Sequence, residues 1–422
     1  MNRSIVSIAK GCDVDMMVED VLANLGGVKT LIKPNSTVVL KPNAGHPGTP
    51  EKSINTSPAF VAAVIKAVRQ AGPKQIILAE ASAIGYDTIE CLKSSGIYQA
   101  AIEAGIDKII DIKSDKDLVN FQVKEAKSNL TTVLLPRFLL EADHVINLPI
   151  FKTHVSMVFS CALKNLKGVV QDKVHLQMHQ ADLAEAIVDL WTVIKADLTI
   201  ADVIRPGEGF GPHSTIPVDF GCLVAGKDPV AVDATVCRMV GMDISRMKIF
   251  KSAQARGIGV TDENLIEVRG KKIEEVYKIL WIPYLGGFEQ WPEYHIYAEN
   301  ACSSCQCLLA YNMERLKALG EYDKNAGITL VLGRKTEIPK GIPPDNLILI
   351  GECLKKWRDQ GISVAGCPPI EPGIQYAIVD RKSYYPQAPD TFGFDLEERK
   401  TKEEIVFKDY IQKLCDKYRK KS

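Results

Sequence analysis

Strand and helix signals alternate through the first two-thirds of the chain, and this alternation restricts the fold more than any other feature. Short apolar runs such as "STVVLKPN" and "KQIILAEAS" end in polar loops, and helical segments such as "SPAFVAAVIKAVRQAG" separate them. Strands that alternate with helices usually pair in parallel, with the helices packed on both faces of the sheet. We therefore expect an α/β fold with a mainly parallel, twisted sheet flanked by helices.

Length and local composition predict more than one compact unit. A chain of 422 residues is longer than one hydrophobic core usually serves. We expect an α/β domain over residues 1–270, an aromatic and Pro/Gly-rich connector over 271–299, a smaller α/β module over 300–380, and a charged tail with a helix over 381–422. The smaller module carries a cluster of cysteines.

Charge and hydropathy give no reason to expect nucleic acid or a membrane as a partner. The 52 Lys and Arg residues balance the 52 Asp and Glu residues. No apolar run approaches the ~20 residues that span a bilayer, and the first residues lack a signal-peptide pattern. We expect a cytoplasmic protein, and whether it forms a homodimer is left open.

Five cysteines in the last third of the chain are candidates for a metal centre. Three stand in the stretch "NACSSCQC", and one each follows an apolar run and a glycine in "ILIGEC" and "VAGCPP". The carboxyl ends of parallel strands meet at one edge of a sheet, and a helix N-terminus favours thiolates. Clustered cysteines in a reducing compartment are more typical of metal ligands or catalytic thiols than of disulfides.

We expect these thiolates to hold a [4Fe–4S] cluster. A structural zinc site usually shows two Cys-x-x-Cys pairs, whereas this chain has one and no His at the matching spacing. Zinc, redox-active thiols and simple burial of the cysteines are the alternatives. The expected ligands are Cys302, Cys305, Cys353 and Cys367, with Cys307 as a substitute, and three ligands with one open iron are also compatible with the pattern.

Basic and amide side chains follow several apolar runs of the first domain. They are Lys41, Asn43, Lys152, His154, Lys164, Asn165 and Lys167. A half-buried lysine is costly unless an anion pairs with it, so the set predicts a site for a carboxylate or a phosphate. In this site we expect Lys152, Lys164 and His154 to be catalytic, with the lysines neutralising the ligand and His154 acting as general acid/base.

Other residues are assigned to the same expected site. The substrate-binding set is Lys41, Asn43, Asn165, Lys167, Asp202 and Asp233. Asp202 stands at the base of "RPGEGFGP", which lacks the helix that a dinucleotide-binding fingerprint requires. Asp233 lies one turn into an apolar helix, where a lysine is its expected partner, and Asp228 before Pro229 predicts the N-cap of that helix. The spacing of His175, His179 and Asp182 leaves a metal site as an alternative to an ordinary helix surface.

The order of these motifs resembles the domain-of-unknown-function-362 family. The matching pieces are "VVLKPNAG", "TSPAFVAAVIKAVRQAG", "LPIFKTHVSMVFSCALKNLKGVV", "DLTIADVIRPGEGFGP" and "GKDPVAVDATVCRMVG", over roughly residues 36–245. The resemblance implies the α/β fold and iron–sulfur binding, since family members often carry an attached ferredoxin-like module. This chain departs from that pattern, because its Cys-x-x-Cys-x-Cys is not the four-cysteine ferredoxin run.

Together, these features predict an enzyme that binds an iron–sulfur cluster and acts on an anionic small molecule by redox or lyase chemistry, as in anaerobic metabolism. A first alternative is a cluster-bearing electron-transfer or accessory protein that docks to a redox partner and has no substrate of its own. A second alternative is a non-redox isomerase or transferase whose metal site is structural.

Overall fold

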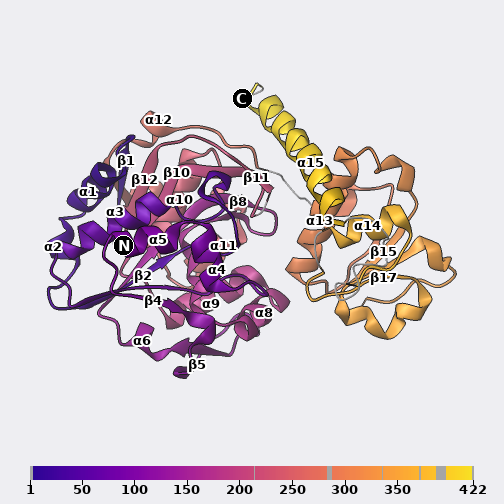
Figure 1. Ribbon diagram of the computed structural model, residues 1–422, viewed down its shortest axis with the longest axis horizontal. Coiled ribbons are helices and arrows are strands. Elements are labelled where there is room, and N and C mark those ends of the chain that lie inside the picture. Colours follow the sequence, from indigo (N-terminus) through magenta and orange to yellow (C-terminus); the bar gives the residue numbers. More distant parts are fainter. Residues whose placement is uncertain are drawn as a thin grey trace. The chain divides into compact units, whose positions relative to one another are not determined.

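The computed structural model describes residues 3–212, 214–282, 288–334, 336–369, 372–385 and 396–420. The chain divides into two compact units, unit 1 (Met1–Ile282) and unit 2 (Pro283–Lys420), and the ribbon of each is drawn in Figure 1. The boundary between the units falls inside the segment that composition predicts to be a connector.

Unit 1 is built on a large, mostly parallel sheet, which confirms the expected fold class (Figure 1). Its main path has the strand order β13-β1-β12-β10-β7-β2-β3-β4, and β12 runs antiparallel to both of its neighbours. The strands of this path are β1 (Ser4–Lys10), β2 (Thr37–Pro42), β3 (Gln75–Glu80), β4 (Lys108–Asp111), β7 (His144–Leu148), β10 (Leu198–Phe210), β12 (Cys222–Gly226) and β13 (Ile266–Gly270). Off the path lie β8 (Ile150–His154), β9 (Val158–Ser160), β11 (Ser214–Pro217) and the hairpin of β5 (Leu118–Gln122) with β6 (Thr132–Pro136).

Helices cover both faces of this sheet. They are α1 (Val14–Asn24), α2 (Val28–Leu31), α3 (Pro58–Arg69), α4 (Thr88–Ser94), α5 (Ile97–Glu103), α6 (Arg137–Leu140), α7 (Ala162–Asn165), α8 (Asp172–Gln180), α9 (Leu183–Val193), α10 (Pro229–Met239), α11 (Lys248–Ala255) and α12 (Ile273–Val276). On β2, Val38 and Leu40 belong to the apolar cluster that includes α1, α3 and α5, whereas Val39 belongs to the cluster that includes α9, α10 and α11. Because side chains of a strand alternate between faces, burial of both faces makes the parallel strands continuous apolar runs in the sequence.

Local signals place the ends of these elements. Asp228 accepts the backbone N–H groups of Val230 and Ala231, so it caps α10 as predicted, and Pro229 occupies the first helical position. The glycine-rich end of β10 turns back into β11 as an antiparallel hairpin rather than leading into a helix. This geometry agrees with the absence of a dinucleotide-binding fingerprint.

The strand order reverses between β2 and β7. From β2 the chain continues to β3 and β4 on one side, and it later returns to β7 and β10 on the other side. Sheets of this type usually bind ligands at such a switch point, outside the carboxyl ends of the strands. Lys41 of β2 and Asn147 of β7 are register partners at this end of the two strands.

Unit 2 has a smaller parallel sheet with the order β14-β15-β16-β17 (Figure 1). Its strands are β14 (His295–Tyr297), β15 (Thr329–Leu332), β16 (Leu347–Ile350) and β17 (Ile362–Val364), and its helices are α13 (Ser303–Ala318), α14 (Gly373–Asp380) and α15 (Leu396–Arg419). Among the residues described for both units, no helix combines the length and apolar character needed to cross a bilayer.

Candidate functional site

Basic side chains gather at the carboxyl edge of the unit 1 sheet. Lys152 and His154 lie two residues apart on β8, Lys164 belongs to α7, Lys167 to the 3₁₀ helix Leu166–Val169, and His179 to α8. Burial lowers the pKa of His154 well below its ordinary value, and repulsion from the other four side chains lowers it further. The structure therefore brings together the three residues predicted to be catalytic.

Lys152 is the most buried ammonium group of this set. Its side chain is 3% exposed, and burial together with repulsion from Lys164 lowers its pKa to about 7. The Nζ atom donates to Asn43 Oδ1 at 2.8 Å and to the backbone carbonyl of Ile54. Both acceptors are neutral, and among the described residues no carboxylate lies within ion-pair distance of this nitrogen.

The hydrogen bonds of His154 determine which of its nitrogens carries the proton. Its Nδ1 atom accepts the backbone N–H of Ser156 at 3.1 Å and lies 3.0 Å from the Ser156 hydroxyl. The neutral ring therefore has its hydrogen on Nε2. Because the pKa of His154 is lowered by burial and by its basic neighbours, the ring is neutral at physiological pH.

Three asparagines form a directed hydrogen-bond chain beneath the lysines. Asn165 Nδ2 donates to Asn147 Oδ1 at 2.8 Å and to the backbone carbonyl of Lys41 at 3.1 Å. Asn165 Oδ1 must then face Asn43, and it accepts from Asn43 Nδ2 at 3.0 Å. Asn147 continues the chain by donating to the carbonyl of Ala162 at the start of α7. The network links the ends of β2 and β7 to the helix that carries Lys164.

Lys41 forms a buried ion pair inside the protein. Its Nζ lies 2.8 Å from Glu80 Oε1, and the two side chains are 1% and 2% exposed. Burial lowers the pKa of Lys41 and raises that of Glu80, but Glu80 also accepts the backbone N–H groups of Ala44 and Ala81, which favours the carboxylate. A Cβ on Gly168 would lie 2.3 Å from Glu80 Oε1, so the turn needs glycine there. Ligand binding by Lys41 stays a prediction, because its charge already has a partner.

The two aspartates of the predicted substrate-binding set are buried with backbone partners. Asp233 accepts the N–H groups of Ala162 and Leu163 at 2.7 and 2.9 Å, and burial raises its pKa to about 7. Asp202 accepts the N–H of Ser57 at 2.8 Å, and burial raises its pKa to about 6. Asp233 therefore positions the start of α7. It hydrogen-bonds to backbone groups and to the Cys161 side chain, where a lysine was expected.

The histidines of α8 surround Lys167. His179 Nε2 lies 2.5 Å from Lys167 Nζ, and His175 Nε2 lies 2.7 Å from the Lys167 carbonyl oxygen. Burial and repulsion from Lys164 lower the pKa of Lys167 well below its ordinary value. Asp182 lies beyond the end of α8 and caps α9 instead, so it does not share a helix face with the two histidines.

The predicted cysteine ligands come from three segments of unit 2. Cys302 is the N-cap of α13, and Cys305 and Cys307 lie inside that helix. Cys353 follows β16 and Cys367 follows β17. The Cys305 thiol lies within electrostatic range of Cys302, Cys353 and Cys367, and its pKa is raised by the hydrogen bond to Cys302, by burial and by these charges.

Cys302 ionises more readily than an ordinary thiol. It accepts a hydrogen bond from the Cys305 thiol and the backbone N–H groups of Ser304 and Cys305, and its pKa is lowered to about 6. The Gly333 N–H donates to the Cys353 sulfur, although burial raises the pKa of that thiol. N–H···S hydrogen bonds of this kind stabilise thiolate ligands and tune iron–sulfur centres.

Two glycines keep the strand-end loops close to the sulfurs. A Cβ on Gly351 would lie 3.5 Å from Cys305 Sγ and 3.6 Å from Cys353 Sγ, so both sulfurs flank the same small space. Gly351 has φ +100° and Gly366 has φ +123°, conformations that favour glycine. The Glu352 N–H donates to the Gly366 carbonyl at 2.9 Å and joins the loops that carry Cys353 and Cys367.

No group of three or more His, Cys, Asp or Glu side chains in the described ranges is arranged to hold a metal ion. A tetrahedral site with metal–sulfur bonds of about 2.3 Å brings its sulfurs to about 3.8 Å from one another. A four-iron cluster is larger and is held by sulfurs that stand farther apart.

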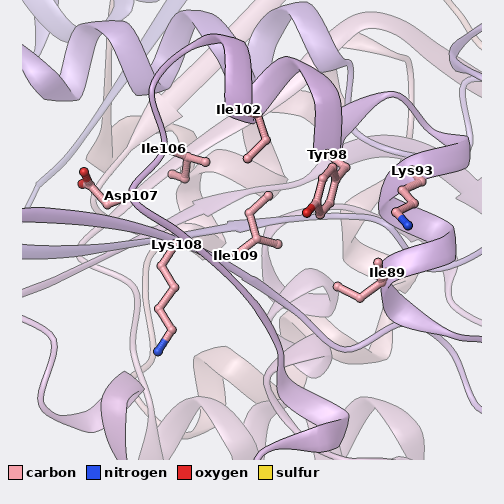
Figure 2. A pocket seen from close by; sticks show the side chains of 8 residues that line it. All are labelled: Ile89, Lys93, Tyr98, Ile102, Ile106, Asp107, Lys108 and Ile109. Carbon is pink, nitrogen blue, oxygen red and sulfur yellow. The ribbon is translucent and has the colours of Figure 1, made fainter.

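A separate cavity of about 330 Å³ lies among α4, α5 and β4, as Figure 2 shows. It is lined by Ile89, Lys93, Tyr98, Ile102, Ile106, Asp107, Lys108 and Ile109. The carboxylate of Asp107 pairs with Arg69 at 2.9 Å. None of the residues predicted to bind substrate or metal lines this cavity.

Residues 38–238 match the family described as Domain of unknown function (DUF362). The resemblance seen in the motif order is thereby confirmed. A thylakoid-associated protein from Synechocystis sp. is 27% identical to this chain over 250 residues, which is 58% of this chain and 75% of the relative.

Two solved structures resemble the chain more distantly. A protein from Thermotoga maritima is 16% identical, with a TM-score of 0.36, and the match covers 55% of this chain and 60% of that one. The lactate racemase apoprotein from Thermoanaerobacterium thermosaccharolyticum is 12% identical, with a TM-score of 0.38, over 78% of this chain and 69% of that one. At these TM-scores neither structure transfers a reaction or a site to this chain.

The DUF362 segment contains the whole basic site, whereas the five clustered cysteines lie outside it. Sequence reasoning missed three residues that shape the basic site: Asn147, Glu80 and Ser156. Glu80 and Asn147 each stand at or near the end of an apolar run, which is the signal that identified Lys41 and Asn43. Ser156 gives no such signal, because its role depends on the turn between β8 and β9.

Proposed function

We propose that this protein is an iron–sulfur enzyme that acts on an anionic small molecule. The observation that carries the proposal is the convergence of Cys302, Cys305, Cys353 and Cys367 from three segments of unit 2. The Cys305 and Cys353 sulfurs flank a small space at Gly351, and a [4Fe–4S] cluster held by four such thiolates would supply one-electron transfer or a Lewis-acidic iron. Cys307 remains the substitute ligand.

The basic site of unit 1 supports the second half of the proposal. Lys152 and Lys167 are desolvated amines, both repelled by Lys164, without a carboxylate at ion-pair distance in the described part of the chain. An anion placed among them would relieve their mutual repulsion and restore the charges that burial disfavours. Carboxylate and phosphate ligands both meet this requirement.

The anion site is tested by calorimetric titration of the purified full-length chain with inorganic phosphate and, separately, with acetate. We expect at least one of the two anions to bind, and we expect Lys164→Met to weaken binding at least about tenfold, because a charge-assisted contact is lost. Lys173→Met, which removes an exposed lysine of α8, is the matched control and should leave binding unchanged. Equal weakening in both variants, or no binding of either anion, would contradict the proposed site.

An electron-transfer protein is the second candidate. Cys353 and Cys367 are exposed, so one side of a cluster held there would lie near solvent, where a redox partner can approach. This candidate predicts a cluster that exchanges electrons rapidly with an added carrier such as a small ferredoxin, while phosphate and acetate fail to bind unit 1. Anion binding that depends on Lys164 would favour the enzyme instead.

A further inference from the structure

The surroundings of Lys152 suit a neutral amine as well as an ammonium group. Two acceptors face the nitrogen, Asn43 Oδ1 at 2.8 Å and the carbonyl of Ile54. A neutral amine has two N–H groups and one lone pair, so these acceptors use both hydrogens and leave the lone pair for an incoming proton. An ammonium group has three N–H groups, and the third is then directed at a bound anion.

The amide network prevents Asn43 from presenting its NH₂ group to Lys152. Asn165 Nδ2 faces carbonyl oxygens, so its Oδ1 must receive the Nδ2 of Asn43. The backbone of Asn43 is also held, because its N–H donates to Thr56 Oγ1 at 2.8 Å. The oxygen of Asn43 is therefore fixed toward Lys152, whichever protonation state the amine adopts.

Charged groups from every neighbouring element act on this amine. Lys164 of α7 repels the ammonium form, and Glu80 of β3 favours it, although Glu80 is paired with Lys41 of β2. His154 of β8, Lys167 of the 3₁₀ helix and His179 of α8 complete the basic surroundings, and Asp172 of α8 acts on Lys167. The balance favours loss of a proton from Lys152 near neutral pH.

His154 is unsuited to accept a proton in the same site. Its Nδ1 lone pair already accepts the Ser156 N–H, and its Nε2 carries the ring hydrogen. Neither nitrogen therefore has a free lone pair for a further proton. Repulsion from Lys152, Lys164 and Lys167 opposes a charged ring. The side chain is equipped instead to donate its Nε2–H to an anionic oxygen.

We propose that Lys152 is the proton-accepting base of the unit 1 site and that His154 is a neutral hydrogen-bond donor to the substrate anion. This inference rests on the proposed function and reverses the roles that the sequence suggested for the two residues. The Lys152 lone pair takes a proton from an O–H or an activated C–H of the anionic substrate and becomes an ammonium group. The electron pair of the broken bond stays on the substrate, where the Lys164 ammonium group and the Nε2–H of His154 offset the added negative charge. The proton transfer itself consumes no oxidant or reductant.

Lysine-selective ¹³C labelling at Cε of the full-length chain tests the assignment by NMR titration. We expect one resonance to titrate near pH 7 in place of the ordinary 10.5, and we expect Lys152→Met to remove it while Lys173→Met leaves it. The inference is overturned if the resonance that Lys152→Met removes titrates at the ordinary lysine value. ¹⁵N-labelled histidine should show His154 with hydrogen on Nε2 and no titration near pH 6.5, and a ring that titrates there would overturn its donor role.

A second variant keeps the test decisive if Lys152→Met fails to fold. Asn43→Asp replaces the neutral acceptor with a carboxylate, which should raise the titration midpoint of the Lys152 resonance by about one pH unit or more. An unchanged midpoint would show that the charge at position 43 does not affect the Lys152 amine, and this result would contradict the inference. Phosphate and acetate binding separates failure of this inference from failure of the proposed function. If an anion binds but Lys152 titrates at the ordinary lysine pKa, this inference alone is overturned. If Lys152 titrates near pH 7 but neither anion binds, the proposed function is overturned.

Discussion

The two candidate sites occupy equivalent positions in their sheets, but one is lined by amines and the other by thiols. Both lie where strand-end loops of a parallel sheet meet a helix, in unit 1 at β2, β7 and β8 and in unit 2 at β16 and β17. In unit 1 the side chains are buried amines whose positions are set by asparagines and backbone groups. In unit 2 the thiols are more exposed, and backbone N–H groups donate to Cys302 and Cys353.

This difference indicates how each site becomes complete. The amide network of unit 1 holds its groups in place before any ligand arrives, so an anion enters a preorganised site. The thiols of unit 2 depend on glycine-containing loops and on whatever they bind, since thiolates gathered in one place repel one another unless a cation lies between them. We therefore expect unit 1 to be sensitive to loss of internal partners, and unit 2 to be sensitive to loss of its sulfurs.

The largest effect is expected from removal of a sulfur. Cys305→Ser and Cys353→Ser should each abolish the visible absorption of anaerobically purified protein, because serine replaces a thiolate ligand of the cluster. Cys12→Ser, at an exposed position in unit 1, is the control and should keep the absorption. If Cys305→Ser kept its full visible absorption, the unit 2 site would not depend on this thiol, and the contrast drawn between the two sites would be wrong.

Breaking the buried ion pair tests whether unit 1 depends on internal partners. Lys41→Met leaves Glu80 buried without its counter-charge and should lower the free energy of unfolding by about 3–5 kcal/mol. Lys66→Met removes an exposed pair with Asp15, both 57% exposed, and should cost less than about 1 kcal/mol. Urea unfolding followed by circular dichroism measures both, and equal costs would argue against a preorganised basic site.

The pH dependence of anion binding follows from the pKa of Lys152. In the free protein this pKa is about 7, so the amine is neutral above that pH, and an anion that has no proton to give it, such as acetate, binds with uptake of a proton from solvent. Phosphate or acetate affinity should therefore fall by up to about tenfold for each pH unit above 7, until the pKa of the complex is reached. His154 stays neutral over this range and contributes no slope.

Calorimetric titrations at pH 6, 7, 8 and 9 check this expectation with the anion that binds. Lys152→Met should flatten the profile for acetate, whose own charge does not change over this range. An affinity that is constant from pH 6 to 9 in the wild-type protein would contradict it.

The smallest expected effect concerns the loop glycines of unit 2. Gly351→Ala places a methyl group 3.5 Å from Cys305 Sγ in a backbone conformation with φ +100°. Gly327→Ala is a matched control, since its φ is +84° and no atom lies within 4 Å of the added Cβ. Both variants should lose about 1 kcal/mol of stability from backbone strain, but Gly351→Ala alone should also bind less iron per chain. Equal iron content in the two variants would place the cluster away from Gly351.

Much of the fold could be predicted from the sequence, because alternating strand and helix signals are local. The same holds for the cysteines, whose spacing and position after apolar runs mark three strand ends and a helix start. The exact start of α13 could not be predicted, since Cys302 has extended backbone angles and Cys305 is already helical, a choice that the neighbouring loops determine.

The roles of the residues in the basic site could not be predicted from the sequence. Lys41 looks like a ligand-binding lysine until the register of β2 with β3 brings Glu80 beside it. The roles of Lys152 and His154 depend on the side-chain oxygen of Asn43 and the backbone N–H of Ser156, and neither contact follows from residue spacing. Long-range pairing, rather than residue type, decides which of these groups can accept a proton.

The most direct test of the central claim is the iron and acid-labile sulfide content of anaerobically purified protein, with EPR spectra of the dithionite-reduced sample. The account predicts about four iron and four sulfide per chain and a signal from a reduced cluster, all lost in Cys353→Ser. Stoichiometric zinc without sulfide, or iron and sulfide that persist when Cys305 and Cys353 are both replaced by serine, would contradict it.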